Sequence, residues 1–342
     1  MRKTILAFAS SLLFLGAANA QSSVTLFGIV DATIRHIDIG NASMTSLTTS
    51  GLNSSRLGFR GVEDLGGGLQ ASFWLENGFG TDTGALVDPT RFFNRRSTVS
   101  LSSRALGEIK LGRDITPSYI AFATVDPFGD NGIGGISLLL SPLGSGALTL
   151  TRSDNLVTYS LPENLGGFFG QIGSAPGEGV VGARYNGGML GWRKDGFLVN
   201  GSYAETTIVA DQYKQAVLAA SYDFGAAKVS AEAVQGKFRA SKQNYYMLGV
   251  TVPVGVGLLR ASYTVSEISG PAVQGQALTN GDDANRIAVG YIHNLSKRTA
   301  LYTTFALIEN KGGSKIAFAG APPGLVAGGT LKGVDIGLRH AF

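Results

Sequence analysis

Apolar and polar residues alternate along most of this chain with the two-residue period of a β-strand. In residues 334–342, one parity carries Val334, Ile336, Leu338, His340 and Phe342, and the other carries Asp335, Gly337, Arg339 and Ala341. Successive side chains of a strand point to opposite faces, so each such segment has one apolar face and one small or polar face.

The same alternation predicts strands throughout the chain. Together they make sixteen: 24–35, 56–60, 69–76, 93–102, 107–113, 154–161, 166–174, 180–192, 196–206, 213–223, 226–237, 243–253, 256–268, 284–293, 299–310 and 334–342.

The links between these strands are of two kinds. Every second link is short: 64–67, 103–106, 162–165, 194–195, 224–225, 254–255 and 294–298. Most of the others are longer: 37–51, 78–92, 114–153, 269–283 and 311–329. Short turns at one end and long loops at the other are typical of a barrel that spans an outer membrane, with the short turns on the periplasmic side. The even number of strands then leaves both termini at the periplasmic end.

Composition indicates that the apolar faces meet lipid. The chain has 49 glycines, only 15% charged residues and no cysteine, and its mean hydropathy is +0.16. An open sheet edge in hydrocarbon would leave unpaired backbone groups, so a spanning sheet has to close. We therefore predict an all-β fold, a sixteen-stranded antiparallel transmembrane β-barrel, whose lumen is wide enough to hold water. The alternative is a secreted β-sandwich, which would bury its apolar face in its own core.

The N-terminus predicts export. Arg2 and Lys3 precede an apolar run, and Ala18-Asn19-Ala20 ends in small residues, so residues 1–20 are expected to be a cleaved signal peptide. Residues 21–342 would then form a single barrel domain. Without Arg2 and Lys3, the 28 basic and 24 acidic residues become 26 and 24. This balance is too even to favour nucleic acid as a partner.

Several blocks of sequence resemble the trimeric general porins of Gram-negative outer membranes, most closely their β-proteobacterial branch. They are SSVTLFGIVDATI, SSRLGFRGVEDLGGGLQASFWLE, FNRRSTVSL, LGRDITPSY, VDPFGDN, SDNLVTYSLP, GYIHNLSKRTALY and the terminal Phe342. The resemblance implies a homotrimer in the outer membrane that passes small hydrophilic solutes and ions and catalyses no reaction. It also implies that the third external loop, residues 114–153, folds into the lumen. Phe342 would be the signal that the outer-membrane assembly machinery reads.

Basic side chains share the lumenal parity of three of the first five strands. Arg56 and Arg60 do so on the second strand, Arg96 on the fourth and Lys110 on the fifth. Arg113 resembles a further lumenal arginine of the family. Strict alternation with Ile109 and Leu111 would turn it outward, but we expect a local bulge near Gly112 that keeps Arg113 on the inner basic wall.

Acidic residues are expected opposite this wall. The resemblance places Asp126 and Asp130 of the VDPFGDN segment there, although the family often has a glutamate where this chain has Asp126. Glu76 is inward by parity and could pair with the arginines. Opposite charges across a narrow aqueous slot create a transverse field, and the excess of basic groups favours small anions modestly. The alternative is that the arginines pair with acids and stiffen the wall without setting selectivity.

Three further expectations concern the remaining residues. Aromatic residues near strand ends are candidates for interfacial girdles: Phe27, Phe79, Tyr222, Tyr263, Tyr302 and Phe342. No cofactor or metal site is expected, and a solvated loop tip is the default interpretation of Asp282 and Asp283. The alternative functions are a serine-histidine hydrolase inside the barrel, for which the histidines lack a nucleophile motif, and a substrate-specific channel or adhesin.

Overall fold

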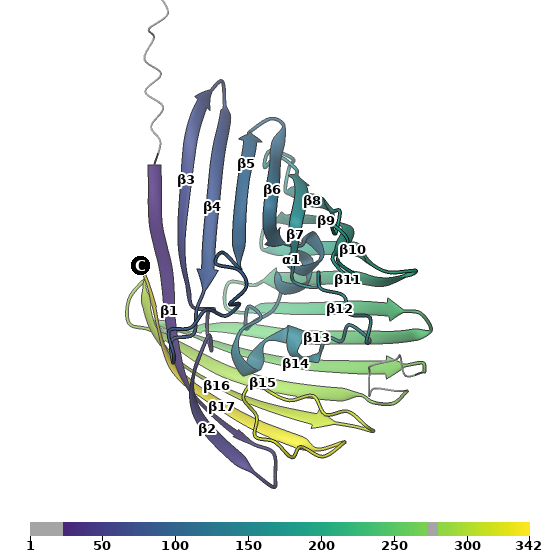
Figure 1. Ribbon diagram of the computed structural model, residues 1–342. Helices are drawn as coiled ribbons and strands as arrows, with labels where there is room; N and C mark the ends of the chain where they lie inside the picture. The colour runs from purple at the N-terminus through teal and green to yellow at the C-terminus, as the bar shows by residue number, and fades with distance from the viewer. Residues whose placement is uncertain (1–22, 272–279) are drawn as a thin grey trace, which may run out of the picture.

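The computed structural model describes residues 23–271 and 280–342, so the predicted signal peptide lies outside the described residues. One antiparallel sheet of seventeen strands makes up nearly the whole of this part of the chain (Figure 1). The strands are β1 (Ser23–Asp38), β2 (Ser43–Thr49), β3 (Arg56–Gly66), β4 (Leu69–Gly78), β5 (Arg96–Ser103), β6 (Gly107–Ile115), β7 (Arg152–Ser160), β8 (Phe168–Ala175), β9 (Arg184–Lys194), β10 (Phe197–Ile208), β11 (Asp211–Asp223), β12 (Lys228–Phe238), β13 (Ser241–Val254), β14 (Gly257–Ser269), β15 (Ala284–Asn294), β16 (Thr299–Asn310) and β17 (Thr330–Ala341). Among the described residues, no helix is long and apolar enough to cross a membrane.

The sheet closes on itself where β1 pairs with β17, from Ile29 opposite Ala341 to Asp38 opposite Lys332. Both β2 and β3 pair with β1, each along a different half of it. They are therefore two halves of one wall strand, and the barrel has sixteen strands as predicted.

The break in the second wall strand has a clear cause. The carboxylate of Asp31 accepts backbone N–H groups from Leu52 at 3.0 Å and Asn53 at 2.7 Å. These bonds hold residues 50–55 in a bend on the inner side of the wall. The sequence pattern placed residues 37–51 in one loop, and this was wrong for β2, because the bend is fixed by a side chain of another strand.

The outer face of the barrel is apolar. On β17, Ile336 is 59% exposed and Leu338 47%, whereas Asp335 on the inner face is fully buried. A sandwich would hide the apolar parity in its core. Here that parity is exposed around a closed sheet, so the sandwich alternative is wrong.

The loops confirm the asymmetry of the two ends. One end has short turns, and the other has the long segments 79–95, 116–151 and 311–329. Two hairpins at the long-loop end are exceptions, because β10–β11 and β12–β13 turn within residues 209–210 and 239–240.

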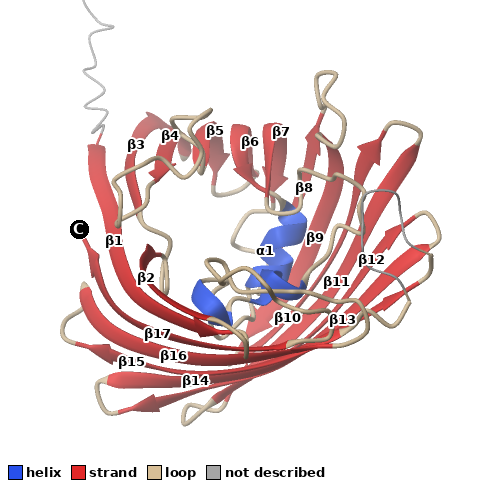
Figure 2. Cartoon of the chain, turned by 60° about the horizontal axis from the view of Figure 1, so that its bottom comes forward, coloured by secondary structure: helices blue, strands red, loops and turns tan. Residues whose placement is uncertain are grey.

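The third external loop, residues 116–151, folds into the barrel (Figure 2). It contains the helix α1 (Pro117–Ala123) and two 3-10 turns, η1 (Gly132–Gly134) and η2 (Ile136–Leu139). Thr116 caps α1 by accepting the N–H of Tyr119, and Pro117 begins the helix.

Apolar contacts hold this loop against one side of the inner wall. Phe122, Val125, Ile136 and Leu139 pack on wall residues Met189, Val217, Ala219, Val234, Tyr245, Met247 and Ala284. Phe128 and Ile133 pack in a second cluster with Ile37, Ala288, Ala306, Ile308, Phe318 and Leu331. The inner face is therefore not uniformly polar, because the part that seats the loop is apolar.

Candidate functional site: the lumenal basic wall

Glu76 on β4 lies at the centre of a group of arginines. Its Oε1 lies 2.5 Å from Nε of Arg95 and 3.3 Å from Nη1 of Arg56. Its Oε2 accepts the indole N–H of Trp74 at 3.2 Å. With its oxygens occupied in this way, the carboxylate fixes both guanidinium groups in position.

Arg152 extends this group across the barrel wall. Its Nε donates to the backbone carbonyl of Arg95 at 3.0 Å. Sequence reasoning missed both Arg95 and Arg152. The predicted strand 93–102 gave Arg95 the outward parity opposite to that of Arg96, and Arg152 fell within the predicted loop 114–153, so parity selected neither. The adjacent Arg95-Arg96 pair at a strand start was the only available signal.

Two other arginines stack on aromatic rings in the lumen. The guanidinium carbon of Arg96 lies 4.4 Å from the ring centroid of Trp74, and that of Arg60 lies 5.2 Å from it and 5.5 Å from Phe27. Phe27 and Trp74 meet edge to face at 5.1 Å. Such stacking orients the cations without neutralising them. Phe27 is therefore a lumenal residue, and the expectation that it belongs to an interfacial girdle was wrong.

Lys110 and Arg96 converge on Asp114, a residue that the sequence analysis did not select. Nζ of Lys110 lies 3.0 Å from Oδ2 of Asp114, and Nε of Arg96 lies 3.5 Å from the same atom. Lys110 and Asp114 are four residues apart on β6 and share its inner face.

Arg113 does not join the group around Glu76. Its Nη1 binds Asp154 at 2.6 Å, and its Nε donates to the carbonyl of Asn94 at 2.6 Å. A bulge does lie beside Gly112, but the additional residue belongs to β7, where Leu156 and Ser153 face Gly112 and Asp114. Alternation on β6 is uninterrupted, so the bulge gives no reason for Arg113 to turn inward.

Asp126 and Asp130 are occupied within the loop itself. Asp126 accepts the N–H groups of Phe128 at 3.0 Å and Asp130 at 2.7 Å. Burial raises the pKa of Asp126 to about 6, against the lowering effect of these N–H groups. Asp130 accepts the hydroxyl of Tyr119 at 2.7 Å and the N–H of Ser137 at 2.8 Å. Both carboxylates thus shape the loop.

A second lumenal network ties the loop to the wall, and sequence reasoning missed it too. Arg35 and Asp335 form a buried ion pair with Nε and Oδ1 2.7 Å apart, and the N–H of Ile133 approaches Asp335 at 3.5 Å. Tyr302, which was expected in an interfacial girdle, is buried and donates its hydroxyl to Asp31. Its parity on β16 is inward, so its assignment to the interface was wrong.

The described hydrogen bonds of the histidines do not assemble a hydrolase triad. In the described part of the chain, His36 bonds Thr45, His293 bonds Tyr291 and His340 bonds Thr299. None of these contacts supplies the acid that would orient a catalytic base.

The charges connected along β3–β7 are unbalanced. They comprise the cations Arg56, Arg60, Arg95, Arg96, Lys110 and Arg152 and the carboxylates Glu76, Glu108 and Asp114. A closed membrane barrel with an inserted loop and a cationic inner wall places this protein in the class of channel-forming outer-membrane proteins.

The chain belongs to the Gram-negative porin family, whose family model matches residues 6–313. The outer membrane porin protein 32 of Delftia acidovorans is 40% identical over 374 aligned residues and covers all of both chains. An outer membrane porin protein of Bordetella pertussis is 29% identical, again over both full chains. The resemblance stated from the sequence blocks is confirmed, and the protein is an outer-membrane porin.

Solved structures agree with this assignment. The anion-selective porin from Comamonas acidovorans superposes with a TM-score of 0.84 at 37% identity, covering 94% of this chain and all of that one. OmpF of Salmonella typhi superposes with a TM-score of 0.65 at 15% identity, covering 93% of this chain and 97% of the other. At that identity the second likeness shows the fold alone.

Proposed function

We propose that this porin is a passive diffusion channel with a modest preference for small anions, and that the cationic wall of β3–β7 sets this preference. The observation that carries the proposal is the pairing of Arg56 and Arg95 with the single carboxylate of Glu76, with a third cation, Arg152, bonded to the backbone of Arg95. The solved porin from Comamonas acidovorans is described as anion-selective, which supports the same direction.

The selectivity follows from charge in a narrow aqueous slot. Arginine keeps its charge at every physiological pH, and its fork can pass a carboxylate or phosphate between donors. The low-dielectric barrel wall focuses the field of the fixed charges into the water. Arg60 and Arg96 add positive charge to the wall without obstructing the path of the solute, because the aromatic rings beneath them hold them against the wall.

This proposal assigns different roles from those that the sequence suggested to Arg113, Asp126 and Asp130. Asp126 and Asp130 act mainly by holding the loop in shape, and both are partly exposed and add negative charge near the slot at neutral pH. Arg113 is neutralised by Asp154 and contributes little to the preference.

We also propose that three copies assemble side by side and that Phe342 acts as the assembly signal. A solved relative of the same fold, OmpT of Vibrio cholerae, is described in a trimer form. The main-chain N–H of Phe342 donates to the carbonyl of Gly28 at 3.0 Å, and its ring lies where a side chain at position 28 would be. Crosslinking of the native protein, resolved by electrophoresis, tests the number of subunits.

The test of selectivity is the reversal potential of the Arg56→Ser, Arg95→Ser, Arg152→Ser triple variant in a salt gradient across a planar bilayer. Removing three charges close to the ion path should reduce the anion-to-cation permeability ratio by about tenfold. Arg239→Ser, which removes an exposed arginine outside the lumen, is the control and should leave the ratio unchanged. If the triple variant keeps the wild-type potential, the arginines stiffen the wall and do not set selectivity.

A further inference from the structure

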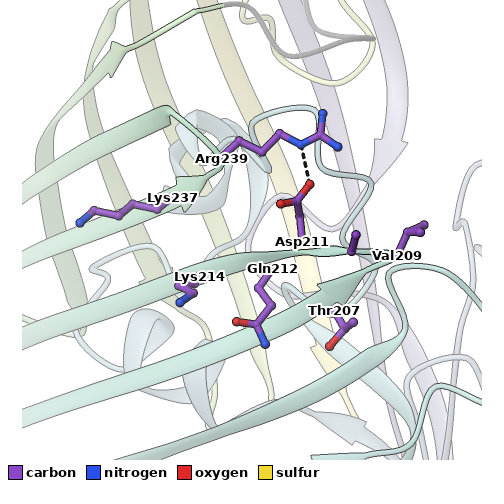
Figure 3. A pocket seen from close by; sticks show the side chains of 8 residues that line it. Thr207, Val209, Asp211, Gln212, Lys214, Lys237 and Arg239 are labelled. Atoms are coloured by element: carbon purple, nitrogen blue, oxygen red, sulfur yellow. Dashed lines mark hydrogen bonds and ion pairs between the residues drawn. The ribbon is translucent and has the colours of Figure 1, made fainter.

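Two pockets lie on opposite faces of the sheet. The larger, of about 510 Å³, is on the outer wall beside Lys237, and its Arg239 is already paired with Asp211 at 2.7 Å (Figure 3). The smaller, of about 220 Å³, lies between α1 and the strands β7–β9, toward the short-turn end of the barrel. Its side chains Phe169 and Met189 have the inward parity of their strands. This lumenal pocket is therefore within reach of solutes that cross the channel.

Much of the lining of the lumenal pocket is apolar. Phe169 on β8 and Met189 on β9 line it from the wall, and Ile120 lines it from α1. The Phe169 ring occupies the space over Gly191, which lies directly opposite it on β9, so a side chain at position 191 would collide with the ring. The glycine thus lets Phe169 lie against the wall, where it offers surface to the apolar part of a small ligand.

Arg193 supplies an unpaired cation at this pocket. Its guanidinium carbon lies 5.3 Å from the ring centroid of Phe169, and such stacking orients a cation without neutralising it. Glu163, in the turn between β7 and β8, also lines the pocket. Within residues 23–271 and 280–342, neither Arg193 nor Glu163 forms an ion pair. The pocket therefore carries two opposite charges that do not neutralise each other.

A buried hydrogen-bond acceptor lines the same pocket. Gln171 lies directly opposite Ser160 and donates its amide Nε2 to the Ser160 hydroxyl at 2.8 Å. The amide Oε1 of Gln171 is buried and has no hydrogen-bond partner in the described part of the chain. A buried acceptor without a partner is costly, so a ligand that donates a hydrogen bond to this oxygen would be favoured.

We propose that the lumenal pocket is a transit site for single amino acids with an apolar side chain. The carboxylate of the solute binds the guanidinium of Arg193, and its ammonium group donates to Gln171 Oε1 and to Glu163. Its side chain packs on Phe169 and Met189. A solute with only a carboxylate would be repelled by Glu163 and would leave the Gln171 oxygen unpaired, so the lining favours a zwitterion over a simple anion. The volume is below that of sites for drug-sized ligands, as a single amino acid requires.

The test measures how L-phenylalanine interrupts the chloride current of single channels in a planar bilayer, which yields an association constant. Wild-type protein should bind L-phenylalanine about tenfold more tightly than Arg193→Gln does, the loss expected for one charge-assisted contact. Phe169→Ala should weaken binding by a similar factor, because it removes part of the apolar lining. Mobility of the unheated protein in electrophoresis verifies that each variant is folded.

Three further solutes test the wild-type protein without any variant. Phenylpropionate lacks the ammonium group, phenylalanine amide lacks the carboxylate, and glycine lacks the apolar side chain. Each should bind about tenfold more weakly than L-phenylalanine. Phenylpropionate binding as tightly as L-phenylalanine would overturn the proposal, because the pocket would then be a simple anion site.

The matched control is Lys194→Gln, which removes the next side chain of β9, exposed and of outward parity, and should leave the association constant unchanged. Equal affinity of Arg193→Gln and wild type would also overturn the proposal. The inference rests on the proposed diffusion function only for the passage of solutes to the pocket. Because L-phenylalanine carries no net charge, its binding is independent of the reversal potential that tests anion preference.

Discussion

The two sides of the lumen have the same strand alternation, but their inward side chains have different roles. On β3–β7, the inward side chains are charged and partly open to water: Arg56 is 23% exposed and Arg96 24%. On β9–β16, the inward face lies under the third external loop, where Glu232 is 4% exposed and Arg286 1%. The inserted loop thus divides one cylindrical wall into a side that meets solutes and a side that seats the loop.

Polar groups on the two sides are satisfied differently. Glu76 binds two arginines and a tryptophan. Within the described chain, neither carboxylate oxygen of Glu232 and neither amide atom of Asn200 has a hydrogen-bond partner. Parity alone makes these residues equivalent, because it reports only the face of the sheet. What a lumenal charge does depends on whether the loop covers it.

The largest expected effect comes from releasing the loop with Asp126→Ala. This change removes the acceptor for N–H groups of Phe128, Asp130 and Ile136, at a cost to the loop of about 3 kcal/mol or more. The covered side should then open to solutes, and single-channel conductance should rise. Ser137→Ala, on an exposed residue of the same loop, is the control. Unchanged conductance in Asp126→Ala would mean that the apolar contacts alone hold the loop.

A smaller effect is expected from Glu76→Gln on the open side. Loss of one negative charge about 5 Å from the ion path is worth about 0.8 kcal/mol in water, or about a fourfold rise in anion preference. Glu108→Gln, whose carboxylate approaches Lys110 only at 3.9 Å, is the comparison and should have a weaker effect. Reversal potentials of the two variants decide whether Glu76 tempers the cationic wall; a lower anion preference in Glu76→Gln would contradict this role.

The pH dependence should be smaller again. Because burial raises the pKa of Asp126 to about 6, this carboxyl loses its charge as the pH falls through that value. Anion preference should then increase by about twofold, the effect of one charge at about 10 Å. The folded state binds this proton more tightly than the unfolded state, so Asp126 also contributes a loss of stability as the pH rises from about 4 to about 6. Reversal potentials measured from pH 4 to pH 8 should lose this step in Asp126→Asn.

The smallest effect on selectivity is expected from Glu232→Gln on the covered side. Removing a buried carboxylate that lacks protein partners should raise the free energy of unfolding by about 1 kcal/mol and leave the reversal potential unchanged. Heat-induced loss of the folded electrophoretic band measures the first quantity, with Glu163→Gln in an exposed turn as control. A shifted reversal potential would place Glu232 on the ion path and remove the distinction between the two sides.

The sequence predicted what depends on regular strands. Alternation identified the sixteen wall strands and the inward parity of Arg60 and Arg96. It could not identify Arg95, to which it gave the outward parity, or Arg152, which fell within a predicted loop, or the contacts of Asp126, which lies in an irregular loop. Phe27 and Tyr302 were misassigned for another reason: residue type was given more weight than parity, and their parity was inward.

The ion pair between Arg35 and Asp335 has a consequence for the order of folding. These residues lie directly opposite each other on β1 and β17, the strands that meet only when the barrel closes. The N–H of Ile133, in the inserted loop, reaches the same carboxylate. The seat for this part of the loop combines Ile37 of β1 with Ala288, Ala306, Ile308 and Leu331 of β15–β17. It is therefore complete only when the first and last strands have met, and a barrel that has not yet joined them has its channel still unfinished.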